Sequence, residues 1–173
     1  MRLARLVYSL LLAAALLGEP VLAQGTVALG VGVTQPVGSF HDGFLRGPFV
    51  RGELGLTAPG WDWLILRAEA HRLPRTFGPG HAALVTVVVG AKHALVSWRV
   101  RASELRLLPE VALGGSALDP SGRDWTPDFG VHGGVAVELP GEPVGVQAFI
   151  GVTHVFAGLS YRYITMGVVF ALR

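Results

Sequence analysis

The chain has 173 residues, of which 51% are hydrophobic and 15% are Asp, Glu, Lys or Arg, and its formal net charge is +2. A chain this apolar is not intrinsically disordered. In soluble domains about 25% of the residues are charged, so this chain has too few charged residues for the surface of an ordinary soluble domain. The sequence has no cysteine and no run of basic residues. This excludes disulfides, cysteine-ligated zinc, a cysteine nucleophile and a lipid-modified N-terminal cysteine, and we expect no nucleic-acid partner.

The N-terminal residues have the pattern of a secretory signal peptide. A short basic start is followed by an uncharged, mainly apolar segment over residues 6–17, a break at residues 18–20, and Val-Leu-Ala at residues 21–23. The apolar segment is shorter than the roughly 20 residues of a membrane-spanning helix. We therefore expect a cleaved signal peptide over residues 1–23, rather than a membrane anchor, and one mature domain over residues 24–173.

After this leader, apolar residues recur at every second position. In eight stretches, one set of alternate positions holds no charged residue; the stretches are 27–33, 50–56, 64–70, 83–91, 107–113, 129–137, 144–152 and 164–172. The opposite positions hold glycine or polar residues. Such alternation is typical of β-strands that have one apolar and one polar face.

The composition of the polar face and the connections indicate a membrane barrel. Glycines with a few long charged side chains suit the narrow interior of an eight-stranded barrel. Connections near residues 58–60, 99–104 and 140–142 are short, whereas the alternate ones are mostly longer, as in outer-membrane barrels. The fold predicted is all-β: an eight-stranded antiparallel up-and-down transmembrane β-barrel with the apolar face outward. Residues 26–35 and 161–172 should pair to close it.

Aromatic residues gather near both sets of strand ends, which predicts two girdles at the membrane interfaces. The girdle near the short turns would contain Trp61, Trp63, Trp98 and Phe170, and the girdle near the long loops Phe40, Phe44, Phe49, Phe77, Trp125, Phe129, Phe156 and Tyr161.

The C-terminal pattern Thr165-x-Gly167-x-x-Phe170-x-Leu172 resembles the β-signal of outer-membrane barrels. The chain departs from that signal by ending on Arg173 and by having Leu172 in place of the final aromatic. Residues 30–40 resemble the opening strand and first loop of small bacterial outer-membrane β-barrel proteins, the OmpA/OmpX-like "porin family" type. The resemblance extends over the mature chain. It implies a monomer in the outer membrane of a Gram-negative cell, surrounded by outer-membrane lipid and inserted by the barrel-assembly machinery.

Nine charged residues fall on the predicted inward face. They are Arg51, Arg67, Lys92, Arg106, Glu53, Glu69, Glu110, Asp128 and Glu138. Because buried charges must be paired, we expect one network near mid-barrel, formed by Arg51, Glu53, Arg67, Glu69 and Glu110. Such a network would be either a structural salt-bridge plug or the selectivity lining of a narrow channel.

No catalytic, cofactor or metal residue is expected. Residues 154–159 are similar to a segment of the lipid A deacylases, which implies a serine two residues after His154, but Phe156 stands there and Ser160 is wrongly spaced. His41, Asp42, His81 and Asp124 lack the spacing of metal ligands.

The favoured function is therefore that of a non-enzymatic outer-membrane barrel with a structural or surface-exposed role. The main alternative is a small passive channel or a hydrophobic-ligand binder. A secreted lipocalin-like soluble carrier and a lipid A-modifying enzyme are further alternatives.

Overall fold

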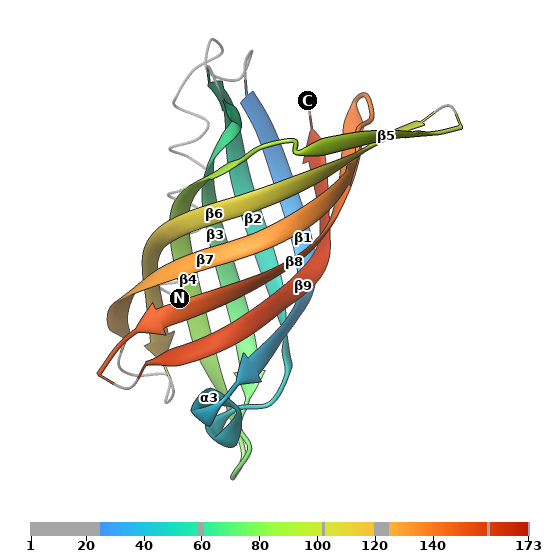
Figure 1. Cartoon of the computed structure of the whole chain (residues 1–173). Coiled ribbons are helices and arrows are strands. Elements are labelled where there is room, and N and C mark those ends of the chain that lie inside the picture. Colours follow the sequence, from blue (N-terminus) through green and yellow to red (C-terminus); the bar gives the residue numbers. More distant parts are fainter. Residues whose placement is uncertain (1–24, 59–60, 102, 120–124, 159, 173) are drawn as a thin grey trace.

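The computed structural model describes residues 25–172 apart from 59–60, 102, 120–124 and 159 (Figure 1). The predicted signal peptide lies outside the described residues. Within them, no helix combines the length and the apolar character needed to cross a membrane. The elements are β1 (Gly25–Val37), α3 (Ser39–Gly43), β2 (Gly47–Ala58), β3 (Trp61–Pro74), β4 (His81–Lys92), β5 (Val96–Val100), β6 (Ser103–Asp119), β7 (Thr126–Leu139), β8 (Val144–Phe156) and β9 (Tyr161–Leu172).

The strands form one closed antiparallel barrel. Apart from β4 and β5, strands that are neighbours along the chain pair with one another. β4 pairs with β6, and β1 pairs with β9 from Val27↔Leu172 to Val37↔Arg162. The predicted eight-stranded barrel and its closure by the first and last strands are therefore confirmed. Closure gives every strand of the wall a hydrogen-bonded neighbour on both sides.

Nine labelled strands make eight barrel strands because β4 and β5 are two parts of one interrupted strand. Across the interruption, the N–H of His93 donates to the carbonyl of Pro109 (3.3 Å) and the N–H of Leu95 to that of Leu107 (2.9 Å), so pairing with β6 continues. The sequence predicted a short connection near residues 99–104. The structure places this connection at the tip of a hairpin of β5 and β6 that projects past the barrel rim (Figure 1).

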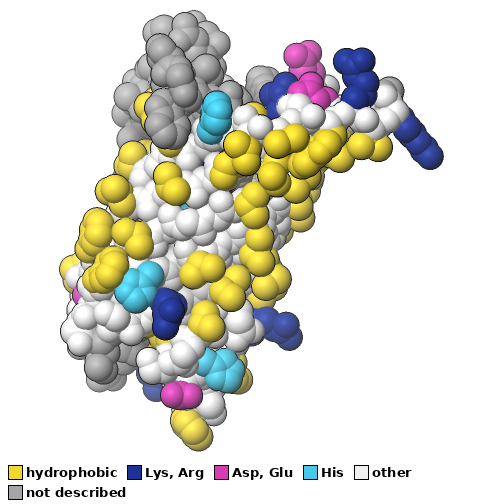
Figure 2. All heavy atoms as spheres, viewed as in Figure 1, with side chains coloured by type: hydrophobic (Ala, Val, Ile, Leu, Met, Phe, Trp, Pro, Cys, Tyr) yellow, Lys and Arg dark blue, Asp and Glu magenta, His cyan; other side chains and the backbone are white. Residues whose placement is uncertain are grey.

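The two faces of the wall have the predicted orientation. None of the alternate positions predicted to face outward is buried; exposed fractions reach 59% at Leu29, 57% at Val89 and 63% at Val111. Hydrophobic side chains are accordingly distributed over the outer wall (Figure 2). The charged and polar side chains at the intervening positions are mostly buried in the lumen.

The two ends of the barrel differ. β1 begins and β9 ends at the rim with the short connections, here called the turn side, and the longer connections with α3 lie at the other rim, the loop side (Figure 1). An apolar cluster fills the lumen at the loop side. It consists of Phe40, Leu73, Ala82, Leu84, Val155, Tyr161 and Tyr163. Phe40 of α3 is in ring contact with Tyr161, with centroids 4.6 Å apart, so the short helix packs onto this cluster.

The predicted aromatic girdles are only partly correct. Phe129 and Phe156 face outward as a stacked pair with ring centroids 6.1 Å apart. Phe40, Phe49 and Tyr161 instead are buried, because strand parity or α3 turns them into the lumen. The side chains of Trp61 and Trp63 lie outside the described residues.

Val87 lies near the middle of β4 on the outward face, so Val87→Arg tests the orientation of the wall. We expect a loss of about 2–4 kcal/mol in folding free energy in lipid vesicles, because a charge at mid-bilayer is poorly solvated. Urea titration of folding into vesicles measures this. Phe77→Arg, at an 81% exposed loop position, is the control and should be neutral. Equal stability of the two variants would contradict the assigned faces.

Candidate functional site

The five charged residues singled out in the sequence come from three strands and meet in the lumen. Arg51 and Glu53 lie two residues apart on β2, and Arg67 and Glu69 do so on β3, so all four point inward. The β2–β3 register pairs Arg51 with Glu69 and Glu53 with Arg67. Opposite charges are therefore neighbours both along each strand and across the pair.

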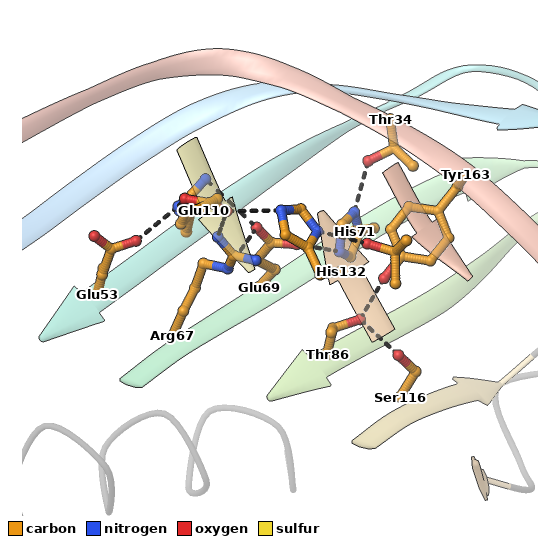
Figure 3. Close-up of polar contacts among 12 residues, drawn as sticks. Thr34, Glu53, Arg67, Glu69, His71, Thr86, Glu110, Ser116, His132 and Tyr163 are labelled. Carbon is orange, nitrogen blue, oxygen red and sulfur yellow. Dashed lines mark hydrogen bonds and ion pairs between the residues drawn. The ribbon is translucent and has the colours of Figure 1, made fainter. Parts of the chain in front are cut away.

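Glu110 of β6 joins this group from another part of the wall. The Arg51 guanidinium lies 2.7 Å from Glu53 and 3.5 Å from Glu110, and the Arg67 guanidinium pairs with Glu69 at 3.3 Å and with Glu110. Their side chains are exposed by only 1–6%. Figure 3 shows Glu110 at the centre of these contacts.

Three further side chains complete the cluster. Lys92 Nζ lies 2.5 Å from Glu53 and 3.5 Å from Glu110, His132 Nε2 lies 2.6 Å from Glu110, and His71 Nε2 lies 3.4 Å from Glu69. All three lie at inward positions of the predicted alternation, and none belonged to the five-residue network that the sequence predicted. We call the eight side chains the lumen network: Arg51, Glu53, Arg67, Glu69, His71, Lys92, Glu110 and His132.

Hydroxyl groups extend the polar contacts along the lumen. Thr34 contacts His71 Nδ1 at 2.6 Å, and Thr153 contacts His132 Nδ1 at 2.9 Å. Toward the loop side, Thr86 lies within hydrogen-bond distance of Tyr163 (2.8 Å) and of Ser116 (3.1 Å) (Figure 3). The contacts of Thr34 and Thr153 orient the rings of His71 and His132.

The remaining charges predicted to face inward are placed differently. Gln147 links Glu138 to the lumen network by accepting a hydrogen bond from Lys92 at 3.3 Å, whereas Arg106 lies on the hairpin of β5 and β6 instead of in the lumen. Glu138 is buried and accepts a hydrogen bond from Gln147 at 3.1 Å. Arg106 is half-buried and pairs with Glu104 at 2.9 Å. Asp128 is half-buried near the start of β7.

Two hollows lie in or along the barrel wall. A hollow of about 10 Å³ lies beside Glu53, Lys92 and Glu138, which is roughly the room that one water needs. A larger hollow of about 560 Å³ follows β1 to β4, but most of the side chains that line it, Val50 and Ala70 among them, face outward.

The residues of the predicted assembly signal lie at the closing seam. Thr165 is fully buried and pairs with Thr34, while Phe170 and Leu172 face outward and are 51% and 53% exposed. Gly167 faces inward directly opposite Gly32. A Cβ on Gly167 would lie 2.3 Å from the carbonyl oxygen of Val31, so the backbones approach too closely for a side chain there.

The two residues weighed as a hydrolytic pair lie outside the lumen. His154 faces outward against the ring of Phe156, with centroids 4.5 Å apart, and Ser160 is exposed just before β9. In the described part of the chain, no group of three or more His, Cys, Asp or Glu residues is placed to hold a metal ion. Asp124 lies outside that part.

Glu110→Gln tests the lumen network because it removes a charge while keeping the shape of the side chain. Since Arg51, Arg67 and Lys92 would each lose a carboxylate, we expect unfolding to become easier by about 3–5 kcal/mol. Urea unfolding in vesicles provides the measurement. Glu104→Gln, which breaks the half-exposed pair with Arg106, should leave stability nearly unchanged. If both variants matched the wild type, the network would not stabilise the barrel.

Gly167→Ala tests the seam. Its Cβ would push β1 and β9 apart, and we expect a loss of about 1–3 kcal/mol on refolding into vesicles without any assembly factor. Gly133→Ala is the matched control, since nothing lies within 4 Å of a Cβ there. A stable Gly167→Ala variant would contradict the close approach.

Comparison with known proteins concerns the fold. No protein-family model matches the sequence, and no match was found among curated proteins. The crystal structure of Neisserial surface protein A has a TM-score of 0.62 and 12% identity, over 86% of this chain and 96% of that one. The N-terminal β-barrel domain of Pseudomonas aeruginosa OprF has a TM-score of 0.50 and 10% identity, over 86% and 98%. The chain therefore has the fold of the small eight-stranded outer-membrane barrels, as the OmpA/OmpX-like resemblance implied.

Proposed function

We propose that the protein is a non-enzymatic barrel of the bacterial outer membrane with a structural or surface-exposed role. The observation that carries this proposal is the combination of an apolar outer wall on every barrel strand with a charged, buried lumen. In this proposal residues 1–23 are the export signal, the longer loops face the outside of the cell, and the protein is a monomer surrounded by outer-membrane lipid.

The exposed apolar belt argues against a soluble carrier. A lipocalin-like carrier needs a polar outside and an apolar cavity, whereas Leu29, Val111 and Ile150 are 59%, 63% and 49% exposed on three different strands. In water such a surface would promote aggregation, and in a bilayer it is solvated by acyl chains.

The lumen argues against a channel. Opposite charges span it at hydrogen-bond distances, and the apolar cluster with Phe40 fills its loop side. Moving an ion through would require breaking several buried pairs, each costly to leave uncompensated. The lumen network therefore acts as a structural plug in this proposal.

The closing strand β9 has a second role in the proposal. Phe170 and Leu172 are exposed on the lipid face, while Thr165 and Gly167 face the lumen, so the two halves of the signal lie on opposite faces of one strand. We propose that the barrel-assembly machinery binds this strand before it pairs with β1.

Localisation is tested by expressing the full chain in a Gram-negative host and fractionating the membranes. The expected product lies in the outer-membrane fraction, begins at Gln24 by mass spectrometry, and migrates differently on gels with and without heating. A soluble periplasmic product would overturn the membrane assignment. An outer-membrane product that retains residues 1–23 would overturn the cleavage site alone.

We expect no stable conductance from refolded protein in planar bilayers, because the narrow lumen of eight strands is filled by side chains. Single-channel recording measures this, with a large porin recorded in the same bilayers as the positive control. A steady ohmic current would instead support the passive channel.

A further inference from the structure

The hairpin at the turn side is the part of the wall that leaves the barrel. It comprises β5 and residues 103–107 of β6, and we call it the turn-side hairpin. Among the described residues, β5 pairs only with β6, and all five of its residues are exposed. Figure 1 shows it extending sideways from the rim rather than continuing along the barrel axis.

The turn-side hairpin has two chemically different faces. The register pairs Val96 with Leu107 and Trp98 with Leu105, so these apolar side chains share one face, together with Val100. Val96, Trp98 and Val100 are 41%, 44% and 51% exposed. The other face carries polar and charged residues, namely Ser97, Arg99, Glu104 and Arg106.

The apolar face continues the outer wall of the barrel. On β6, Leu105 and Leu107 are followed at alternate positions by Pro109, Val111 and Leu113, the last two of which are 63% and 57% exposed. Figure 2 shows hydrophobic side chains along the side of the projecting hairpin that is turned to the barrel wall, with acidic and basic side chains on its opposite side and at its tip.

We propose that the turn-side hairpin lies on the phospholipid leaflet at the turn side of the membrane, with its apolar face in the headgroup region and its charged face in water. This inference rests on the proposed membrane location of the barrel. An isolated two-stranded hairpin is marginally stable in water, and contact with the bilayer would cover the apolar face that the barrel leaves open.

The depth of the hairpin follows from its free edge. The outer edge of β5 has backbone groups that need water or headgroup partners, so the hairpin lies at the interface and does not enter the hydrocarbon. Trp98 fits this depth, because an indole ring prefers the boundary between apolar and polar regions. Arg99, Arg101 and Arg106 outnumber Glu104, and their excess charge attracts anionic headgroups.

Single-cysteine labelling tests the orientation, and the natural chain contains no cysteine that would interfere. Nitroxide labels are placed on the apolar face (Val96→Cys, Val100→Cys) and on the polar face (Ser97→Cys, Arg99→Cys). The full chain is refolded into vesicles of phosphatidylethanolamine and phosphatidylglycerol, and collisions with oxygen and with a water-soluble nickel complex are measured. Two reference labels are measured in the same way: Val89→Cys on the outer wall reports a lipid environment, and Phe77→Cys at a loop tip reports water.

We expect labels on the apolar face to collide more with oxygen and less with nickel than labels on the polar face, with values between those of Val89→Cys and Phe77→Cys. Labels on the polar face should resemble Phe77→Cys. If Val89→Cys reports lipid but both hairpin faces report water, the hairpin proposal is wrong and the barrel proposal stands. Apolar-face labels shielded from both reagents would indicate a protein partner, such as a strand added to the free edge of β5, and would also overturn the proposal. A water-exposed Val89→Cys would overturn the membrane location itself.

Discussion

Hydrogen-bond satisfaction of the backbone is the constraint on which the rest of the structure depends. In lipid, an unpaired strand edge costs several kcal/mol per group, so the first and last strands must meet. The pairing of β1 with β9 meets this requirement, and Gly32 and Gly167 allow the two backbones to approach at the seam. Closure with eight strands then sets a narrow lumen, and every inward side chain must fit within it.

The narrow lumen explains why the charges are arranged as alternating pairs. Arg51 and Glu53 on β2 stand opposite Glu69 and Arg67 on β3, and Glu110 reaches both arginines. Each ion thus has partners on more than one strand, which offsets the cost of removing it from water. In the proposed function, these contacts make the lumen network a plug.

The turn-side hairpin is a pair of strands that extends beyond the closed wall of the barrel. β6 continues past the wall, and within the described ranges β5 is its one neighbour there, so one strand edge and one apolar face are left without a partner strand in this part of the chain. The apolar residues there match the chemistry of the neighbouring outer wall. A leaflet surface can cover that face and solvate the edge at once.

The sequence by itself determined the strand periodicity, the apolar outer face, the closure by residues 26–35 and 161–172, and the inward charges apart from Arg106. A period of two assigns each side chain to a face, the composition of the polar face indicates which face is outward, and backbone pairing in lipid requires the closure. Tertiary structure alone decided which inward residues meet, since the register brings Lys92 and His132 to carboxylates on other strands. The alternation already placed Phe49 and Tyr161 on the inward face, although the girdle prediction, which used only proximity to a strand end, did not. Tertiary structure also extended β5 and β6 beyond the rim, because the alternation does not specify the length of a strand.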